Sequence, residues 1–578
     1  MPIKQNYRHS FFNKFRLAIG TIALMGMSIA TNISEVHANE KPLTLMQAVA
    51  KYGGDGTRMW GLLLKENFLF PSPSALYKMK ETQSKTELTL CNGLSDAVCQ
   101  GQDLYQILRL DPCVAASQLS CLGDFWAVDS TGKRVETKFL RTIPFESPQA
   151  VQENLPVNLP ASTSLGSVWQ IPGVKNSAGS DQYFVYTYIT MFKRATEAKF
   201  SFGEINNSIV AVEELRGNYG VPQIIPTGGS GATGATSTPD GRDCIALEIG
   251  MCLAPVNFPD GYRFGMTLKM GEKLNGWFHG RMSLPQISIN NWKTGQEISI
   301  EGEPVKVPSL DFVVPVSQLS EEQMALYNQC VRENCGGRGM LTGIAQTGGN
   351  LAHPSSMNLV TKFASAYREQ ATSTASTWAF RNMFNHGGSI NSEKLNSCTR
   401  QTDSLNGVVL TNALTYSSGP PTFDENSGSL VYKVASPHLE ENGSVASGTY
   451  DLTIRSDVAR CLYNFSSAPV KAEVSITGED GASRIATTLV NEKDGWLYLS
   501  ARGFTFSSPT IRVRLSQDQV AEQSKNQPPV QAQEQTKQVL VSPAVKPALK
   551  RSITCVKGKT SKKVTSTNPK CPAGWKKK

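Results

Sequence analysis

Twelve cysteines constrain the fold of this chain more than any other feature, because all of them follow residue 90 and most lie close to another cysteine. An even number of cysteines in an exported chain is typical of disulfide bonds. Structural zinc sites need close C-x-x-C pairs or neighbouring histidines, and the sequence has neither. The spacing predicts the pairs Cys91/Cys99, Cys113/Cys121, Cys244/Cys252, Cys330/Cys335, Cys398/Cys461 and Cys555/Cys571. The connectivity within residues 91–121 stays open.

The N-terminus predicts a cleavable signal peptide over residues 1–38. Its first sixteen residues carry four basic side chains and no acid, residues 17–30 are uncharged, and Val36 and Ala38 supply the small residues of a cleavage site. The alternative is an uncleaved anchor, but the apolar run is shorter than the about 20 residues of a transmembrane helix. No later segment is apolar enough to span a bilayer. We therefore expect a secreted or cell-surface protein.

The charge of the chain is concentrated at its C-terminal end. The whole chain has a formal charge of +9, residues 1–38 carry +3 and residues 550–578 carry ten basic residues and no acid, so residues 39–549 carry −4. Such a tail suits an anionic envelope surface, because each lysine near anionic lipid contributes about 1 kcal/mol. Nucleic acid is not an expected partner of an exported chain. The expected contacts with anionic cell-envelope polymers come from Lys557, Lys559, Lys562, Lys563, Lys570, Lys576, Lys577 and Lys578.

Composition and periodicity divide the chain into seven parts, and predict a mainly β, multidomain, disulfide-bonded fold with a smaller α segment. The parts are the signal peptide (1–38), an N-terminal α+β region with four cysteines (39–226), a flexible linker or loop (227–239), a β-hairpin region followed by a helical segment (240–397), a C-terminal β-sandwich (398–516), a disordered Gln/Pro/Lys spacer (517–549) and a basic, disulfide-closed tail (550–578).

Local patterns predict individual elements within these parts. Apolar and polar residues alternate over residues 262–270, which is typical of a strand, and the following turn into residues 277–278 predicts a hairpin. Ser320 and Gln323 form a capping-box pattern at the start of a helix. Seven short β-type runs lie between residues 408 and 515, which favours a sandwich.

No catalytic, cofactor-binding or metal-binding set stands out in the sequence. His279, His353, His386 and His438 lie in separate segments without a second ligand at metal spacing, so we expect surface or turn histidines. Serine-nucleophile and metalloprotease signatures are missing or misplaced. Glycoside hydrolysis needs two carboxylates about 5 to 9.5 Å apart, which spacing in a sequence does not reveal.

Some tryptophans have the surroundings of glycan-binding aromatics. Trp277 and Trp292 lie beside Gly, His, Arg or Asn residues, as do Trp378 and Trp496. Packing in a core with a polar edge is the alternative. The sequence gives Trp277 and Trp292 as candidates for facing a glycan.

The tail, with ITCVKGK from residue 553 and KCPAGWKKK from residue 570, resembles a C-terminal element of secreted proteins of small planktonic actinobacteria. The body, with GWFHGR at residues 276–281 and SDVARCLY at residues 456–463, is similar to large uncharacterised secreted proteins of the same group. Neither resemblance implies an activity or catalytic residues.

These features together predict a secreted, cell-surface-associated structural or binding protein, similar in role to an adhesin, with its basic tail on envelope polymers. The alternative is a secreted hydrolase of polysaccharide or cell-wall polymer. A cleft with two carboxylates and tryptophans would favour the hydrolase.

Overall fold

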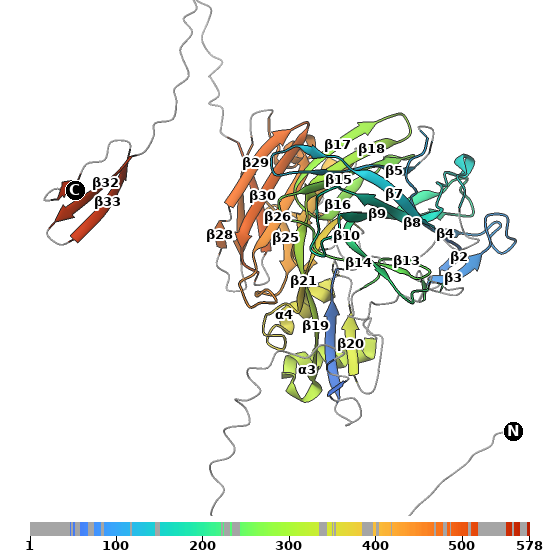
Figure 1. Ribbon diagram of the computed structural model, residues 1–578, viewed down its shortest axis with the longest axis horizontal. Helices are drawn as coiled ribbons and strands as arrows, with labels where there is room; N and C mark the ends of the chain where they lie inside the picture. Colours follow the sequence, from blue (N-terminus) through green and yellow to red (C-terminus); the bar gives the residue numbers. More distant parts are fainter. Residues whose placement is uncertain are drawn as a thin grey trace, which may run out of the picture. The chain divides into compact units, whose positions relative to one another are not determined.

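A computed structural model describes residues 47, 50–51, 58–66, 74–81, 86–115, 118, 120–144, 151–220, 223–224, 232–233, 243–333, 344–348, 351, 354–383, 397–399, 404–417, 419–466, 470–477, 483–485, 487–506, 510–517, 551–557, 560–566, 571 and 575–577. The expected signal peptide and almost all of the expected spacer lie outside these residues. The chain forms two compact units, Met1–Asp518 and Gln519–Lys578. It is mainly β (Figure 1).

A long sheet runs through the first unit, and hydrogen bonds connect its strands in one unbroken path. Neighbours are antiparallel except for the parallel pair β16–β22. In spatial order the strands are β3 (Thr86–Cys91), β2 (Ala75–Glu81), β4 (Leu104–Arg109), β9 (Gln182–Lys193), β10 (Ser201–Arg216), β21 (Ser373–Asn382), β16 (Gly276–Arg281), β22 (Leu405–Thr411), β26 (Gly448–Arg455), β30 (Trp496–Phe504) and β29 (Thr487–Lys493).

Further strands extend this long sheet at three places. The additions are β7 (Lys138–Pro144) and β8 (Ser164–Gln170) beside β9; β13 (Ala246–Glu248) and β14 (Met251–Pro255) beside β10; and β19 (Val305–Pro315), β1 (Met59–Leu64) and β20 (Ile344–Gly348) beside β21. A separate two-stranded pair joins β11 (Gln223–Ile224) to β12 (Ala232–Thr233). That pair includes the only two described residues of the expected linker at 227–239.

A second sheet of five strands covers part of one face of the long sheet. Its order is β17 (Ser283–Asn291), β18 (Gln296–Glu303), β15 (Arg263–Met270), β5 (Cys121–Val128) and β6 (Arg134–Val135). The alternation at residues 262–270 is confirmed as strand β15. The predicted hairpin with residues 277–278 is wrong, because β15 pairs with β5 and β18 whereas β16 pairs with β21 and β22. The actual hairpin joins β17 to β18.

The C-terminal part of the first unit is a β-sandwich, as predicted. Strands β22, β26, β30 and β29 of the long sheet face a third sheet. The third sheet contains β23 (Thr415–Tyr416), β24 (Thr422–Asp424), β25 (Ser429–Ala435), β31 (Thr510–Ser516), β27 (Lys471–Thr477) and β28 (Ser483–Ile485). Leu452 and Leu499 pack with Tyr432 and Val513 in the core between the two layers. Figure 1 shows these C-terminal strands in orange.

The long sheet has a hydrophobic core on each face. On β16, Trp277 belongs to the core shared with the sandwich, and its neighbour Phe278 belongs to the core shared with the five-stranded sheet. Adjacent strand residues point to opposite faces, so β16 is buried on both sides. This is why β16 pairs at the centre of the long sheet and not at the end of a hairpin.

Helices are few among the described residues. The described α-helices are α3 (Glu321–Glu333), α4 (Pro354–Lys362) and α6 (Ser456–Tyr463), and the 3-10 turns are η1 (Leu155–Val157) and η2 (Val316–Gln318). The capping box is confirmed: Gln323 N donates to Ser320 Oγ at 3.2 Å, and Ser320 N donates to Gln323 Oε1 at 3.0 Å. Strands from 39–226, 240–397 and 398–516 share sheets, so these sequence regions are interleaved within one compact unit.

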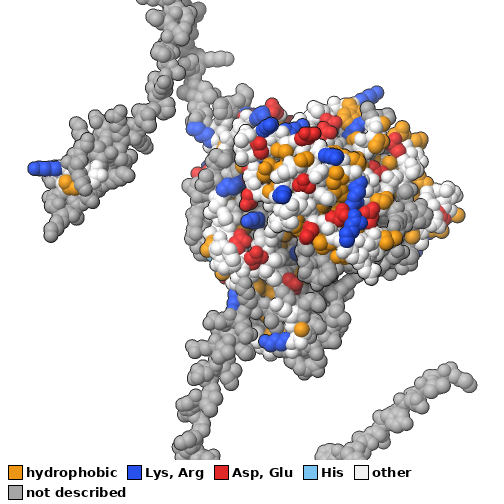
Figure 2. Space-filling view, in the orientation of Figure 1, with side chains coloured by type: hydrophobic (Ala, Val, Ile, Leu, Met, Phe, Trp, Pro, Cys, Tyr) orange, Lys and Arg blue, Asp and Glu red, His pale blue; other side chains and the backbone are white. Residues whose placement is uncertain are grey.

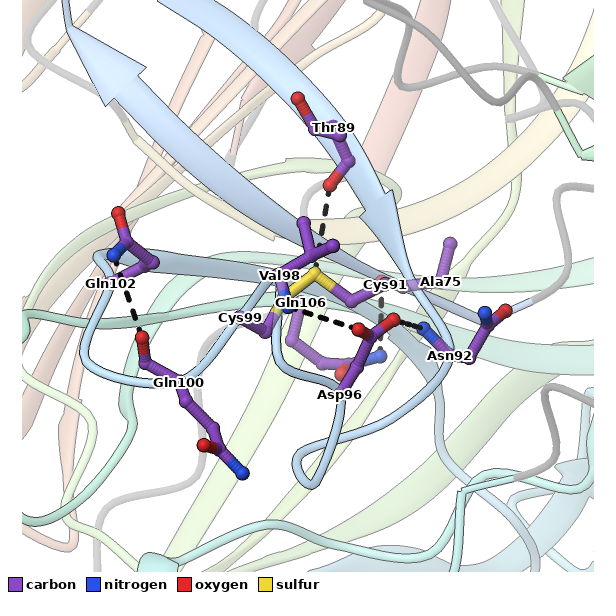
Figure 3. The surroundings of a disulfide bond; sticks show 10 residues. All are labelled: Ala75, Thr89, Cys91, Asn92, Asp96, Val98, Cys99, Gln100, Gln102 and Gln106. Atoms are coloured by element: carbon purple, nitrogen blue, oxygen red, sulfur yellow. Dashed lines mark hydrogen bonds between the residues drawn. A yellow bond between two sulfur atoms is a disulfide. The ribbon is translucent and has the colours of Figure 1, made fainter.

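Four of the predicted disulfides are confirmed, and they include both pairs within residues 91–121. They are Cys91–Cys99, Cys113–Cys121, Cys244–Cys252 and the long-range Cys398–Cys461. Figure 3 shows the first, which closes a loop in which the Asp96 carboxylate accepts hydrogen bonds from the amides of Asn92 and Val98. The side chains of Cys330 and Cys335 lie outside the described residues.

The second unit contains a small antiparallel sheet. Strand β32 (Arg551–Lys557) lies between β33 (Thr560–Ser566) and β34 (Lys576–Lys577). Cys571 is disulfide-bonded, and the side chain of its expected partner, Cys555, lies outside the described residues. The backbone register sets Lys562 and Lys577 opposite Cys555.

Candidate functional site

A groove of about 580 Å³ opens where the five-stranded sheet ends and the long sheet continues. Strands β17, β18, β15 and β5 line one wall, and β26, β29 and β30 line the other. The two sheets share a hydrophobic core beneath β16 and β22, but β17 is the outer strand of the second sheet. At that edge β17 packs against β26, and the long sheet carries polar side chains that are buried on β26 and exposed on β29.

On β26, side chains alternate strictly between the sandwich core and the groove, and those facing the groove form part of its wall. Tyr450, Leu452 and Ile454 point into the sandwich core, whereas the intervening Asp451 and Thr453 line the groove. Residues two apart on a strand share a face. The polar residues of this strand therefore belong to the groove.

The neighbouring strands of this wall add a tyrosine and an amide. The register sets Asn491 of β29 and Thr453 of β26 on either side of Tyr498 of β30. Burial raises the pKa of the Tyr498 hydroxyl, although a backbone hydrogen bond from Ile287 of β17 lowers it. That hydrogen bond joins the two walls across the edge of β17.

Asp451 is a buried carboxylate in this wall. Arg502 Nη2 lies 2.8 Å from each of its oxygens. Burial raises the pKa of Asp451 above its ordinary value, and the Arg502 charge offsets only part of this effect. The backbone amide of Leu284 also donates to the carboxylate.

Leu284 has an unusual backbone at the rim of the groove. Its φ is +50°, in the left-handed region that residues other than glycine seldom adopt, and the β17–β18 register shifts between Ser283 and Gln286. Such a conformation costs about 1 to 3 kcal/mol and persists only where the surroundings fix it. Asp451 supplies this fixing contact, and the bulge leaves the Leu284 side chain 38% exposed beside the groove.

The other wall is organised by a tryptophan lying across a glycine. In the register, Gly265 of β15 lies between Trp126 of β5 and Glu301 of β18. Gly265 has no side chain, so the indole can reach across the strand, where any Cβ would clash with it. The indole Nε1 donates to Glu301 Oε2 at 2.6 Å. Arg263 Nη2 lies 2.5 Å from Glu301 Oε1. The Arg134 guanidinium carbon lies 4.5 Å from the centre of the ring.

A second hollow of about 790 Å³ lies on the same face of the five-stranded sheet. It shares Trp126, Ser299 and Glu301 with the groove. Ser299 and Thr267 form the floor of the hollow with a hydroxyl–hydroxyl hydrogen bond of 3.0 Å. This face carries polar side chains, whereas the isoleucines on the opposite face of β18 are buried in the core.

The wall of the groove holds a buried hydroxyl group with no described hydrogen-bond partner. Thr453 is 1% exposed, and no group among the described residues bonds its Oγ1. Burial of such a hydroxyl costs free energy.

Charge around the groove is mixed. Arg263, Lys493, Glu301 and Asp494 all line it. On the face of the first unit shown in Figure 2, acidic and basic side chains are interspersed, without a large area of one sign. Neither sign of charge therefore dominates the groove.

A second polar cluster lies deep in the first unit. Glu66, which follows β1, accepts from Arg281 Nε at 2.7 Å and also from Arg381 Nη2. Arg281 donates to the carbonyls of Thr411 and Leu414 at 2.9 and 3.1 Å. Burial alone would raise the pKa of Glu66, but the two guanidinium charges outweigh burial and hold the pKa at about 2. We call Glu66, Arg281, Arg381, His279 and Tyr416 the core network.

His279 of the core network corrects one sequence expectation. We expected a surface or turn histidine, yet His279 is 1% exposed on β16, and its ring stacks on Tyr416 with centroids 3.6 Å apart. Burial and the nearby Arg281 and Arg381 charges hold its pKa well below the ordinary value, so the ring is neutral. No described group bonds either ring nitrogen.

The two tryptophans that were candidates for glycan contact differ in their exposure to solvent. Trp277 is 7% exposed and packs against Gly407, so it presents no ring to the surface. Trp292 is 37% exposed in the β17–β18 turn, where its amide donates to the Gly295 carbonyl. Trp378 and Trp496 are also buried. Sequence reasoning missed Trp126, whose role depends on Gly265 and Glu301 far along the chain.

Two further observations concern membrane spans and metal ligands. Of the described helices, none has the length and apolar character needed to cross a membrane. Within the described part of the chain, no group of three or more His, Cys, Asp or Glu side chains could hold a metal ion.

Comparisons with known proteins give no family for this chain. No family model, no curated protein and no solved structure matches it. Functional inference therefore rests on the groove, the second hollow and the basic tail.

Proposed function

We propose that this chain is an exported, disulfide-bonded binding protein of the cell surface, and that its groove binds carbohydrate. The observation that carries the proposal is the groove itself, in which the polar face of one sheet meets polar side chains of another. Ligand sites are concave and combine apolar surface with a few fixed polar groups. Leu284 and Tyr498 supply apolar surface in this groove, and Ser299 and Asn491 supply hydrogen-bonding groups.

Carbohydrate fits this chemistry because each sugar hydroxyl both donates and accepts a hydrogen bond. Serine hydroxyls and asparagine amides do the same, so Ser288 and Asn491 can bond such a group in either direction. The paired charges of Arg263 and Glu301 neutralise each other and do not favour an ionic ligand.

The basic tail adds a second contact in this proposal. The lysines of residues 550–578 would bind phosphate-bearing or acidic envelope polymers and so retain the protein at the surface. Three short strands present part of this segment, and Lys576 on β34 is exposed.

A secreted hydrolase is the second candidate, because three carboxylates, Glu301, Asp451 and Asp494, line one groove beside a tryptophan. Binding is the better-supported function, since the two buried carboxylates, Glu301 and Asp451, already have strong partners. Glu301 accepts from Trp126 and pairs with Arg263, and Arg502 contacts both oxygens of Asp451. A general acid must be able to give its proton to the substrate.

Electrophoresis of the full exported chain through gels that contain hydroxyethylcellulose, glycol chitin or soluble starch tests the proposed function. We expect at least one neutral polysaccharide to retard the protein. Glu301→Gln should weaken the retardation by roughly tenfold, because the charge-assisted bonds that hold Trp126 and Arg263 in the groove wall become weaker. Glu322→Gln, in an exposed ion pair with Lys362, is the matched control and should leave retardation unchanged. Unretarded migration in every gel would overturn the proposal.

Release of reducing ends from the same polysaccharides separates the two candidate functions. A binding protein releases none, with or without Glu301→Gln. Release that Glu301→Gln or Asp451→Asn abolishes would establish the hydrolase instead.

The role of the tail is tested on cells that express either the full chain or a chain ending at residue 549, which would be washed with salt. We expect salt to remove the full chain from the wall, and the truncated chain to be in the medium before washing.

A further inference from the structure

The groove and the second hollow share a wall, and this sharing bears on the size of the ligand. Both are lined by Trp126, Ser299 and Glu301, which lie on the same polar face of the five-stranded sheet. Two separate sites for small ligands would need a ridge between them. Beside the Trp126 indole, which lies across Gly265, the sheet instead carries only the small side chains of Ser299 and Thr267.

The register shows how the polar face continues across the strands. One row runs from Gln286 through Glu301 and Gly265 to Trp126. The next row runs from Ser288 through Ser299 to Thr267. With neighbouring strands about 4.8 Å apart, the three steps from β17 to β5 cover about 14 Å.

Small residues form the floor along this path, and charged residues form its margins. Beside Thr267 lies Gly123 of β5, where an added Cβ would come within 3.0 Å of the threonine side chain. Lys269 and Glu297, opposite each other in the register, line the far side of the second hollow. The path therefore stays shallow over the strands and is bordered by longer side chains.

We propose that the groove and the second hollow form one continuous binding track, and that its ligand is a linear glycan chain of several units crossing β17, β18, β15 and β5. This inference rests on the proposed carbohydrate function and names the class of ligand more narrowly. The track begins on β26 and β30 of the long sheet and passes Trp126 to end beside Lys269. A single monosaccharide would contact only part of it.

Titration calorimetry of the full chain with cello-, chito- and malto-oligosaccharide ladders, from disaccharide to octasaccharide, tests the continuous track. In the ladder that binds, we expect affinity to rise by roughly tenfold or more with length and then level off, because each added unit makes one or two further hydrogen bonds. Thr267→Gln places a longer side chain on the floor of the second hollow only. It should reduce the affinity for the octasaccharide to that for the short oligomers and leave the short oligomers unaffected.

Thr361→Gln on α4 is the matched control for this variant and should change neither affinity. Equal affinity for short and long oligomers, or an octasaccharide affinity that Thr267→Gln leaves unchanged, would overturn the continuous track while the proposed function stands. Failure of all three ladders and of the polysaccharides would overturn both.

Discussion

The core network and the groove each contain a buried carboxylate that binds arginine, yet the pKa values of the two carboxylates shift in opposite directions. Glu66 faces two guanidinium groups, from Arg281 and Arg381, and its pKa falls to about 2. Asp451 faces Arg502 alone, and its pKa rises. One arginine does not offset the loss of water around a buried carboxylate, whereas two do.

The two carboxylates also differ in what they hold in place. Every nitrogen of the Arg281 guanidinium bonds to Glu66 or to a carbonyl, so the core network joins β1, β16 and the segment after β22. In the groove, Asp451 instead holds the strained Leu284 at the rim. The core network therefore has a structural role, and the groove is the site that we propose for ligand.

The largest expected effect is from Glu66→Gln. Removing this charge leaves two guanidinium groups without their carboxylate, which we expect to lower the free energy of unfolding by about 3 to 5 kcal/mol. Chemical denaturation measures it, with Glu322→Gln as an exposed control that should cost less than about 1 kcal/mol. If the two variants cost the same, the core network is not a main source of stability.

Lowering the pH should destabilise the protein through two groups of the core network, His279 and Glu66. Both pKa values are lowered in the fold, so stability is present above the unfolded pKa and is lost as pH falls below it. For His279 the loss begins below about pH 6.5, and for Glu66 it runs from pH 4.5 to about 2 and amounts to about 3 kcal/mol. His279→Phe, which keeps a ring against Tyr416, should remove the loss that begins below about pH 6.5 and leave the loss caused by Glu66. An unchanged pH profile would contradict the buried neutral histidine.

Asp451→Asn should cost less than Glu66→Gln, about 1 kcal/mol, because the charged form of Asp451 is already disfavoured by burial. Arg502 is partly exposed and keeps access to water after the change. The amide of Leu284 loses its charged acceptor, so its hydrogen exchange should accelerate. A cost equal to that of Glu66→Gln would contradict the distinction between the two regions.

The smallest expected effect is from Thr453→Val, and it has the opposite sign. Because the Oγ1 of Thr453 has no described partner, replacing it with a methyl group should raise the free energy of unfolding by up to about 1 kcal/mol. Thr187→Val is the matched control: its buried Oγ1 bonds Asn207 at 2.8 Å, so its loss should lower stability by about 1 to 3 kcal/mol. Equal losses in both variants would show that Thr453 has a partner in solution.

Local patterns in the sequence predicted much of the fold. The alternation over residues 262–270 gave strand β15, the pair Ser320 and Gln323 gave the start of α3, and cysteine spacing gave the disulfides. Each of these signals depends on residues close in sequence. The partner of a strand does not, and this is why β16 was wrongly paired with β15.

The site was harder to predict, because it depends on contacts between distant segments. Trp126 and Glu301 are 175 residues apart, and their bond requires Gly265 between them. The alternation of Asp451 and Thr453 with apolar residues on β26 is the one local signal of the groove wall. It indicates a polar face, but not which strand borders it.

The central claim is that the groove binds carbohydrate, and Ser299→Trp tests it most directly. Ser299 lines both the groove and the second hollow, and its hydroxyl pairs with that of Thr267. The matched control is Ser373→Trp on β21, where the serine hydroxyl pairs with Ser309 at 2.6 Å. Calorimetric titration with the polysaccharide that retards the full chain should show binding lost in Ser299→Trp and kept in Ser373→Trp, with both variants folded. Undiminished binding by Ser299→Trp would contradict the claim.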